Sequence, residues 1–193
     1  MERRSNKQRS EQTRAHLIQV ARALFNEQGY AETGTPEIVA RANVTRGALY
    51  HHFEGKQALF FAVAMEVAEE VALAIRSTSS TANSAMQNVT EGANAYFAAM
   101  AEKDRAQVLL IQAPAILTAE ELLQTSKVAG SSELKEGLRN ILPKARAEAA
   151  SLDALTSLVS AAFDRAALEI ASGANALEYE RANGQILAAL SVY

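Results

Sequence analysis

The chain has 193 residues, no cysteine, a formal net charge of −3 and an apolar share of 49%, which is enough for a hydrophobic core. The lack of cysteine excludes disulfides and thiolate metal sites, and it favours a cytoplasmic location. The longest uncharged apolar run, residues 106–119, has 14 residues and contains a proline, whereas a membrane-spanning helix needs about 20, so we expect no membrane contact.

Apolar residues recur at helical spacing along most of the chain, and alternating polar and apolar runs are scarce. We therefore predict an all-α fold of about nine helices. A first helix over residues 10–28 ends at Gly29, a residue typical of helix C-caps. The buried stripe predicted for this helix contains Leu17, Ile18, Ala21, Leu24 and Phe25.

Two short helices follow the first. The helix over residues 35–42 has Pro36 in its first turn, where proline is favoured. Asn43, which tolerates a left-handed backbone, ends that helix, and Thr45 caps a third helix that runs to His52. This arrangement predicts a helix-turn-helix.

A long fourth helix begins at Lys56 and runs into a polar loop at residues 77–84. Three pairs have the spacing of a capping box, or nearly so, and predict later helix starts: Ser84 and Gln87, Thr118 and Glu121, Asn175 and Glu178. The stretches between these starts are broken or kinked at Pro114, Gly130 and Pro143. Two final helices are predicted over residues 152–171 and 176–192.

Charge is distributed unevenly along the chain. Residues 1–56 hold 9 Lys and Arg against 6 Asp and Glu, a net charge of +3, and all three histidines. Residues 57–193 hold the other 10 Lys and Arg and 16 Asp and Glu, a net charge of −6. Clustered cations are typical of surfaces that bind phosphate. We therefore predict that the N-terminal arm and the helix-turn-helix, residues 1–56, form the phosphate-binding domain. Residues 57–193 form a second, helical domain, to which the ligand contacts and the dimer interface predicted below belong.

The second helix of a helix-turn-helix enters the major groove of DNA with its N-terminal residues nearest the bases. Arg46 supplies donors that reach a guanine edge or a phosphate, while Gly47 and Ala48 lack the bulk that would keep DNA away. Further donors follow along the same stretch: Tyr50, His51, His52 and Lys56.

The pattern I-x-x-x-A-x-V-T-R-G-x-L-Y-H-H-F-x-x-K, from Ile38 to Lys56, resembles the tetracycline-repressor (TetR) family of transcriptional regulators. The resemblance implies a homodimeric DNA-binding regulator without a cofactor, most often a repressor that a small-molecule effector releases from a palindromic operator. Implied base contacts are Arg46, Gly47 and Ala48. Implied phosphate contacts are Thr35, Thr45, Tyr50, His51, His52 and Lys56.

Purely structural explanations exist for several of these side chains. Tyr50 is amphipathic and could cover the small core together with Phe53. Arg46 and Lys56 could be solvated surface charges. His51 and the neighbouring His52 do not predict a metal site, because adjacent helical residues point about 100° apart and no carboxylate has matching spacing.

The sequence predicts no catalytic residue. All three histidines lie within the first 52 residues, there is no glycine-rich phosphate loop, and no nucleophile stands at recognisable spacing from a base. The alternative function is a helical small-molecule-binding or interaction protein of the same fold that does not bind DNA.

The helix predicted over residues 152–171 has an apolar arc of about 180°, wider than the roughly 100° that one core needs. The extra surface and the last helix could form a four-helix bundle with a second copy, whereas the alternative is a thick monomeric core. A dimer would set two recognition helices about 34 to 36 Å apart. The predicted interface contains Leu155, Val159, Ala162, Phe163, Ala166, Ile170, Ile186, Leu187 and Leu190.

Apolar residues between the fourth and eighth helices could either close into a core or enclose an apolar ligand. Soft and amphipathic side chains often line pockets. The candidate ligand contacts are therefore Met65, Tyr96, Met100 and Gln112.

Overall fold

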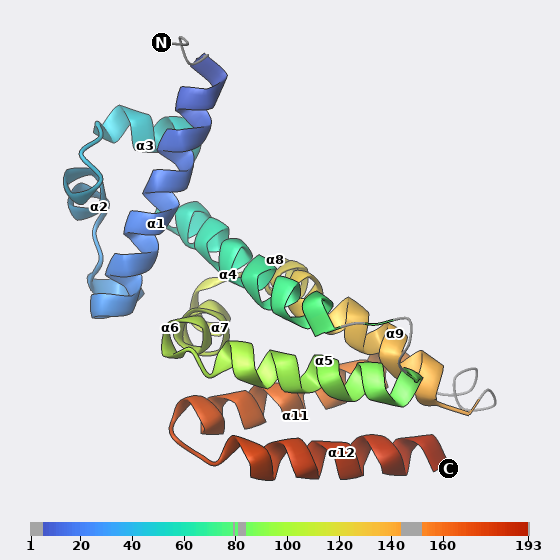
Figure 1. Cartoon of the computed structure of the whole chain (residues 1–193). Coiled ribbons are helices and arrows are strands. Elements are labelled where there is room, and N and C mark those ends of the chain that lie inside the picture. Colours follow the sequence, from blue (N-terminus) through green and yellow to red (C-terminus); the bar gives the residue numbers. More distant parts are fainter. Residues whose placement is uncertain (1–5, 79, 81–83, 144–151, 193) are drawn as a thin grey trace.

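The computed structural model describes residues 6–78, 80, 84–143 and 152–192, so the first five residues of the N-terminal arm lie outside it. The described residues form helices joined by short turns and contain no strand, which confirms the all-α prediction. Figure 1 shows the first three helices gathered at one end of the molecule, which we call the head. The head contains α1 (Asn6–Glu32), α2 (Thr35–Arg41) and α3 (Arg46–His52).

A larger helical body occupies the other end (Figure 1). Six of its elements join end to end into two helical stretches. The first contains α6 (Lys103–Ala106), the π-helical segment η1 (Gln107–Gln112) and α7 (Ala113–Ile116). The second contains α8 (Ala119–Ser126), the π-helical segment η2 (Lys127–Ser131) and α9 (Ser132–Ile141). The other helices are α4 (Lys56–Thr78), α5 (Ala85–Met100), α11 (Leu152–Ala171) and α12 (Ala176–Val192). The described part therefore has nine continuous helical stretches, as predicted.

The local signals of the head are confirmed. The buried residues of α1 are the five of the predicted stripe. Gly29 has φ 85°, which ends the regular part of α1, and Asn43 has φ 52° in the turn between α2 and α3. Both values lie in the left-handed region, which glycine and asparagine tolerate best.

α4 runs from the head into the body and is covered along its whole length. Near its start, Phe60 is fully buried, and its ring centroid lies 5.3 Å from those of Phe25 and Tyr30 in α1. Near its end, Ile75 is buried among the helices of the body. α4 therefore contributes buried side chains to the head and to the body.

The helix starts predicted for the body are present. Ser84 and Gln87 form a complete capping box at α5, and Thr118 and Glu121 form another at α8. At α12, the side chain of Asn175 accepts a hydrogen bond from the Leu177 amide over 3.1 Å. The bounds of α11 and α12 agree with the prediction, and α12 lies at the outer edge of the body (Figure 1).

In the part of the chain that the structure describes, no helix is both long and apolar enough to cross a membrane.

Candidate nucleic-acid interface and ligand cavity

The start of α3 is exposed and is held by a side-chain cap. The Ala48 amide donates to Thr45 Oγ1 over 3.1 Å, which confirms the predicted cap. On the opposite side of α3, Leu49 is fully buried in the head. Because the helix is anchored from behind, Arg46 and Gly47 face solvent.

Gly47 has no structural reason within the chain to be glycine. Its φ is not left-handed, and a Cβ added at this position would meet only Thr45 Oγ1 at 3.9 Å, an ordinary contact. Alanine would fit here and would favour the helix by up to about 1 kcal/mol. The glycine instead leaves the backbone of α3 uncovered on its exposed side, where a molecule from outside can approach closely.

Tyr50 joins the start of α2 to the start of α3. Its hydroxyl group is hydrogen-bonded by Thr35 and Arg46, and these bonds lower the pKa of Tyr50 below 10. The guanidinium carbon of Arg46 lies 5.4 Å from the centre of the Tyr50 ring. Tyr50 is 44% exposed, whereas Phe53 is buried. Of these two side chains, only Phe53 belongs to the core. Three of the predicted contacts therefore form one surface cluster.

The two histidines lie further along α3. Their ring centroids are 5.1 Å apart, and His51 is the more exposed of the two. Burial, and then the neighbouring charges of His51 and Arg14, lower the pKa of His52. Among the described residues, no group of three or more His, Asp or Glu side chains is arranged to hold a metal ion.

Lys56 is engaged with the end of α1. Its Nζ donates to the Tyr30 carbonyl oxygen over 2.8 Å and lies 4.1 Å from the centre of the Tyr30 ring. The ammonium group therefore satisfies a carbonyl where Gly29 ends the regular helix. This structural role of Lys56 has no local sequence signal, because Tyr30 and Lys56 are 26 residues apart.

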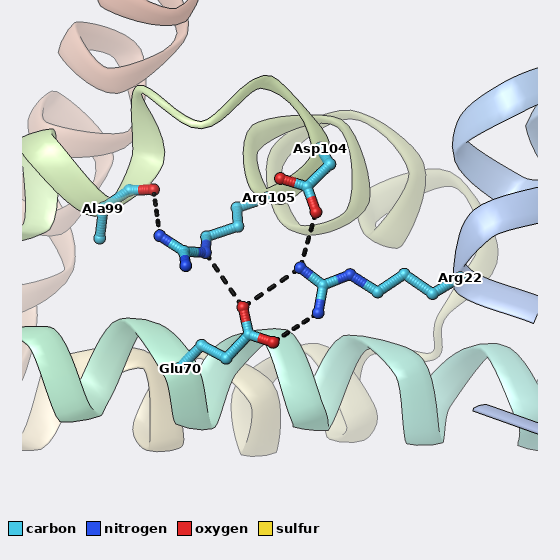
Figure 2. A network of polar contacts seen from close by, with 5 residues as sticks. All are labelled: Arg22, Glu70, Ala99, Asp104 and Arg105. Atoms are coloured by element: carbon cyan, nitrogen blue, oxygen red, sulfur yellow. Dashed lines mark hydrogen bonds and ion pairs between the residues drawn. The ribbon is translucent and has the colours of Figure 1, made fainter. Parts of the chain in front are cut away.

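A polar network joins the head to the body (Figure 2). Arg22 of α1 bonds Glu70 of α4 through Nη1 over 2.5 Å and Asp104 of α6 through Nη2 over 2.6 Å. Arg105 Nε donates to the same Glu70 carboxylate over 3.0 Å, and Arg105 Nη1 donates to the Ala99 carbonyl over 3.1 Å. The hydrogen bond from Arg22 is the main reason why the pKa of Glu70 lies below 4.5.

A second link between head and body comes from Gln112 of η1. Its Nε2 donates to the Phe25 carbonyl oxygen of α1 over 3.0 Å. The side chain is buried, and its Oε1 has no hydrogen-bond partner among the described residues. Gln112 is therefore a contact between domains rather than a wall of the cavity described next.

The body contains a partly open cavity of about 550 Å³ between α4, α5, η1, α7, α8, η2, α9 and α11. Of the four predicted ligand contacts, only Tyr96 lines it. Its hydroxyl group donates to Asp164 Oδ1 over 2.5 Å, and burial raises the pKa of both groups. Met100 is fully buried in the core, and Met65 lies behind the wall, with its sulfur 3.9 Å from the hydroxyl oxygen of Thr125.

The predicted dimer residues differ in burial. Five are buried, two are partly buried and two are exposed: Val159, Phe163, Ala166, Ile170 and Leu187; Leu155 and Leu190; Ala162 and Ile186. Leu187 has no exposed surface and Phe163 is buried, with its ring centroid 5.4 Å from that of Phe97, so both belong to the core of their own chain. Ala162 and Ile186 are exposed, and they lie in two stripes that we call the outer face. The outer face consists of Leu158, Ala161, Ala162 and Arg165 on α11 and Ala182, Ile186 and Ala189 on α12.

Comparison with known proteins finds two family models that match this chain. The family described as "Bacterial regulatory proteins, tetR family" matches residues 17–63, which contain the start of α3 and the first turns of α4. The family described as "Tetracyclin repressor-like, C-terminal domain" matches residues 86–191, more than half of the chain.

Curated relatives resemble mainly the head. The transcriptional regulator AcrR of Shigella flexneri is 47% identical over 57 residues, 30% of this chain and 26% of AcrR. The transcriptional repressor DhaR of Mycobacterium sp. strain GP1 is 34% identical over 98 residues, 51% of this chain and 48% of DhaR. The chain thus spans about a quarter to a half of the length of these relatives.

Solved structures resemble the whole chain. A TetR-family regulator from Pectobacterium atrosepticum is 27% identical, with a TM-score of 0.68 over 98% of this chain and 99% of that protein. The fatty acid degradation regulator FadR from Bacillus halodurans has a TM-score of 0.74 over 96% of both chains, and at 17% identity it shows the shared fold alone.

The polar network predicts a measurable contribution of Glu70 to stability. Glu70→Ala should lower the free energy of unfolding by about 1 to 3 kcal/mol, because Arg22 and Arg105 both lose a charged hydrogen-bond partner. Glu69→Ala, on an exposed neighbour, should change it by less than about 0.5 kcal/mol. Chemical denaturation of both variants at neutral pH tests this, and equal losses would contradict it.

The contribution of Glu70 to the free energy of unfolding changes with pH in a defined direction. The pKa of Glu70 is lower in the folded chain than its ordinary value of 4.5, so its stabilisation is present above that value and is lost as the pH falls through the folded-state pKa. The difference between wild type and Glu70→Ala should therefore shrink on acidification.

Proposed function

This chain belongs to the TetR family of bacterial regulatory proteins, and from that premise we propose that it is a dimeric, cytoplasmic regulator of transcription. In this proposal it binds a palindromic operator through α3, and a small molecule in the cavity of the body releases it. The outcome on DNA is repression. The observation that carries the proposal is the exposed start of α3, where a glycine without a structural role stands beside an exposed arginine.

The geometry of the head supports the proposed DNA contacts. Arg46, Gly47 and Ala48 meet base edges in the major groove, because they form the exposed start of the second helix of the motif. The residues that bind phosphate around it are Thr35, Thr45, Tyr50, His51, His52 and Lys56. For Lys56, the ammonium group has three donors, so it can bind a phosphate while it keeps the Tyr30 carbonyl.

Dimerisation uses the outer face of α11 and α12. The exposed residues of the two stripes recur at intervals of three and four, the spacing of helices that pack into a bundle. Leu158 is 71% exposed and Ile186 is 49% exposed, so each stripe of the outer face includes a large apolar side chain in contact with water. Apolar side chains gathered on one exposed face mark surfaces that bind other proteins. Two copies joined here by a twofold axis present two α3 helices to a palindrome.

Release by a ligand needs a physical connection between the cavity and the head. Leu109 and Leu110 of η1 line the cavity, and Gln112 of the same segment holds the Phe25 carbonyl of α1. Asp104, which precedes η1, holds Arg22. A ligand that favours a different position of η1 therefore acts on α1 and, through it, on the spacing of the two heads.

Gly47→Ala tests the role of the bare backbone in DNA binding. The variant should be as stable as wild type or more stable by up to about 1 kcal/mol, since alanine fits the fold. It should bind operator DNA about tenfold more weakly or worse, which corresponds to ~1.4 kcal/mol, because the added methyl group keeps the helix from the bases. Thermal unfolding and an electrophoretic mobility assay separate the two effects. Wild-type affinity in a stable variant would remove Gly47 from the interface.

Arg46→Ala should relax the base preference at one position of each half-site by about 1 to 3 kcal/mol. Arg41→Ala is the matched control: it removes the same charge from the head, but Arg41 is paired with Glu27 over 2.5 Å. Selection of bound duplexes from a random library, repeated at several salt concentrations, gives both preference and slope. Equal changes in the two variants would argue against base recognition by Arg46, and a wild-type protein that selects no duplex would favour a ligand-binding protein without DNA.

Substitutions in the outer face test the dimer. Leu158→Glu and Ile186→Glu should each convert the dimer into a monomer at micromolar concentration, because a carboxylate would be buried without a partner. Leu123→Glu is the control, since Leu123 is 56% exposed on α8, outside the outer face. Sedimentation equilibrium measures the mass. Dimeric Leu158→Glu and Ile186→Glu proteins would place the interface elsewhere.

A further inference from the structure

The cavity has the size and walls of a site for a small organic molecule. Its volume of about 550 Å³ lies within the range of roughly 300 to 1,000 Å³ that is usual for such sites. Apolar side chains from several helices line it, among them Ile75, Leu109, Leu122 and Phe163. An occupant that buries most of its surface here must therefore be largely apolar.

The charged residues of the wall are all acidic. Glu133, Glu136 and Asp164 line the cavity, and its lining residues include no lysine, arginine or histidine. Glu133 has a cation near it, because its Oε1 lies 3.5 Å from Nη1 of Arg76, and Glu136 is exposed. An anionic ligand would find no positive side chain in this wall and would meet three carboxyl groups.

Asp164 differs from the other two acids. It lies next to Phe163 on α11, and it accepts a hydrogen bond from the hydroxyl group of Tyr96, a neutral donor. Burial raises the pKa of Asp164, and no positive side chain of the described residues acts against this effect. A partly buried carboxyl group without a cation is less favourable in its charged form than one in water, and a bound cation would reduce that penalty.

Two aromatic rings line the same cavity as this carboxyl group. Tyr96 and Phe163 both line the cavity, with ring centroids 6.5 Å apart. Faces of aromatic rings attract organic cations, and the attraction grows when water is excluded. A carboxyl group and two rings on one wall therefore combine the two elements that recognise an alkylammonium group.

We infer that the cavity binds a largely apolar organic monocation, a lipophilic amine or quaternary ammonium compound, with Asp164 as its counter-ion and Tyr96 and Phe163 beside its charged group. This inference rests on the ligand-responsive function proposed above and adds the chemical class of the ligand.

Three probes with the same ten-carbon chain separate charge from apolar fit: decyltrimethylammonium, decanoate and 1-decanol. Isothermal titration calorimetry of the full chain, below the aggregation concentration of each probe, should give the tightest binding for decyltrimethylammonium, about tenfold or more over the other two. Absent binding of the cation, or equal or tighter binding of decanoate or 1-decanol, would overturn the inference. This comparison needs no substitution in the protein.

Asp164→Asn then tests the counter-ion. The amide has the same shape and can still accept from Tyr96, so the variant should fold, which circular dichroism checks. Affinity for decyltrimethylammonium should fall about tenfold or more, while affinity for 1-decanol should stay within about twofold. Glu120→Gln, an exposed position of α8 outside the cavity, should leave both within about twofold. Unchanged binding of the cation by Asp164→Asn would overturn the role of Asp164.

Release of DNA is measured separately, so that the two proposals can fail independently. If decyltrimethylammonium binds with the expected dependence on Asp164 but leaves the protein–DNA complex intact, the inference stands and ligand release is refuted. If the protein binds its operator but the cation fails the calorimetric comparison, the DNA-binding function stands and the inference is refuted.

Discussion

The burial of α4 on more than one side is the constraint on which the rest of this structure depends. Its buried residues occur on every turn from Leu59 to Ile75, so the helix has no wholly polar side to leave in water. The first turns are covered by α1, through the contact of Phe60 with Phe25 and Tyr30, and the later turns by α5 and η2. Neither α1 nor the helices of the body alone can bury the apolar residues of this 23-residue helix. For this reason the head and the body cannot be treated as independent units.

The way α4 is covered by α1 and by the body explains the role of the polar network. Glu70 lies on the part of α4 between the two covers, where α1 and α6 both come close (Figure 2). Arg22 is bound by two carboxylates from different helices, so a shift of α6 relative to α4 would break at least one charged hydrogen bond. Packed helices with a few directional bonds between them tend to have discrete positions rather than a continuous range. The network therefore defines a particular position of the head relative to the body.

Sequence reasoning succeeded where the signal was local. The caps at Thr45, Ser84 and Thr118 depend on a residue and its neighbour three positions later, and the positive φ of Asn43 depends on one residue, so all could be predicted. It failed where the partner is distant in the chain: 48 residues separate Arg22 from Glu70, and 68 separate Tyr96 from Asp164. Helical periodicity gives the width of an apolar arc but not what covers each part of it. For that reason it did not distinguish Leu187, buried in its own chain, from Leu158, which is exposed.

Under the proposed function, linkage sets a limit on how a ligand in the cavity would act on the head. A ligand shifts an equilibrium only by the difference between its affinities for the two states, and DNA must weaken ligand binding by the same factor by which the ligand weakens DNA binding. Couplings of this kind are typically about 1 to 3 kcal/mol, or roughly 5- to 150-fold. That is the scale of one or two charged or buried hydrogen bonds. The contacts of Gln112 with Phe25 and of Asp104 with Arg22 are two such bonds, and both join α1 to the stretch that lines the cavity. Loss of these contacts alone would therefore supply a coupling of the required size, without unfolding any helix.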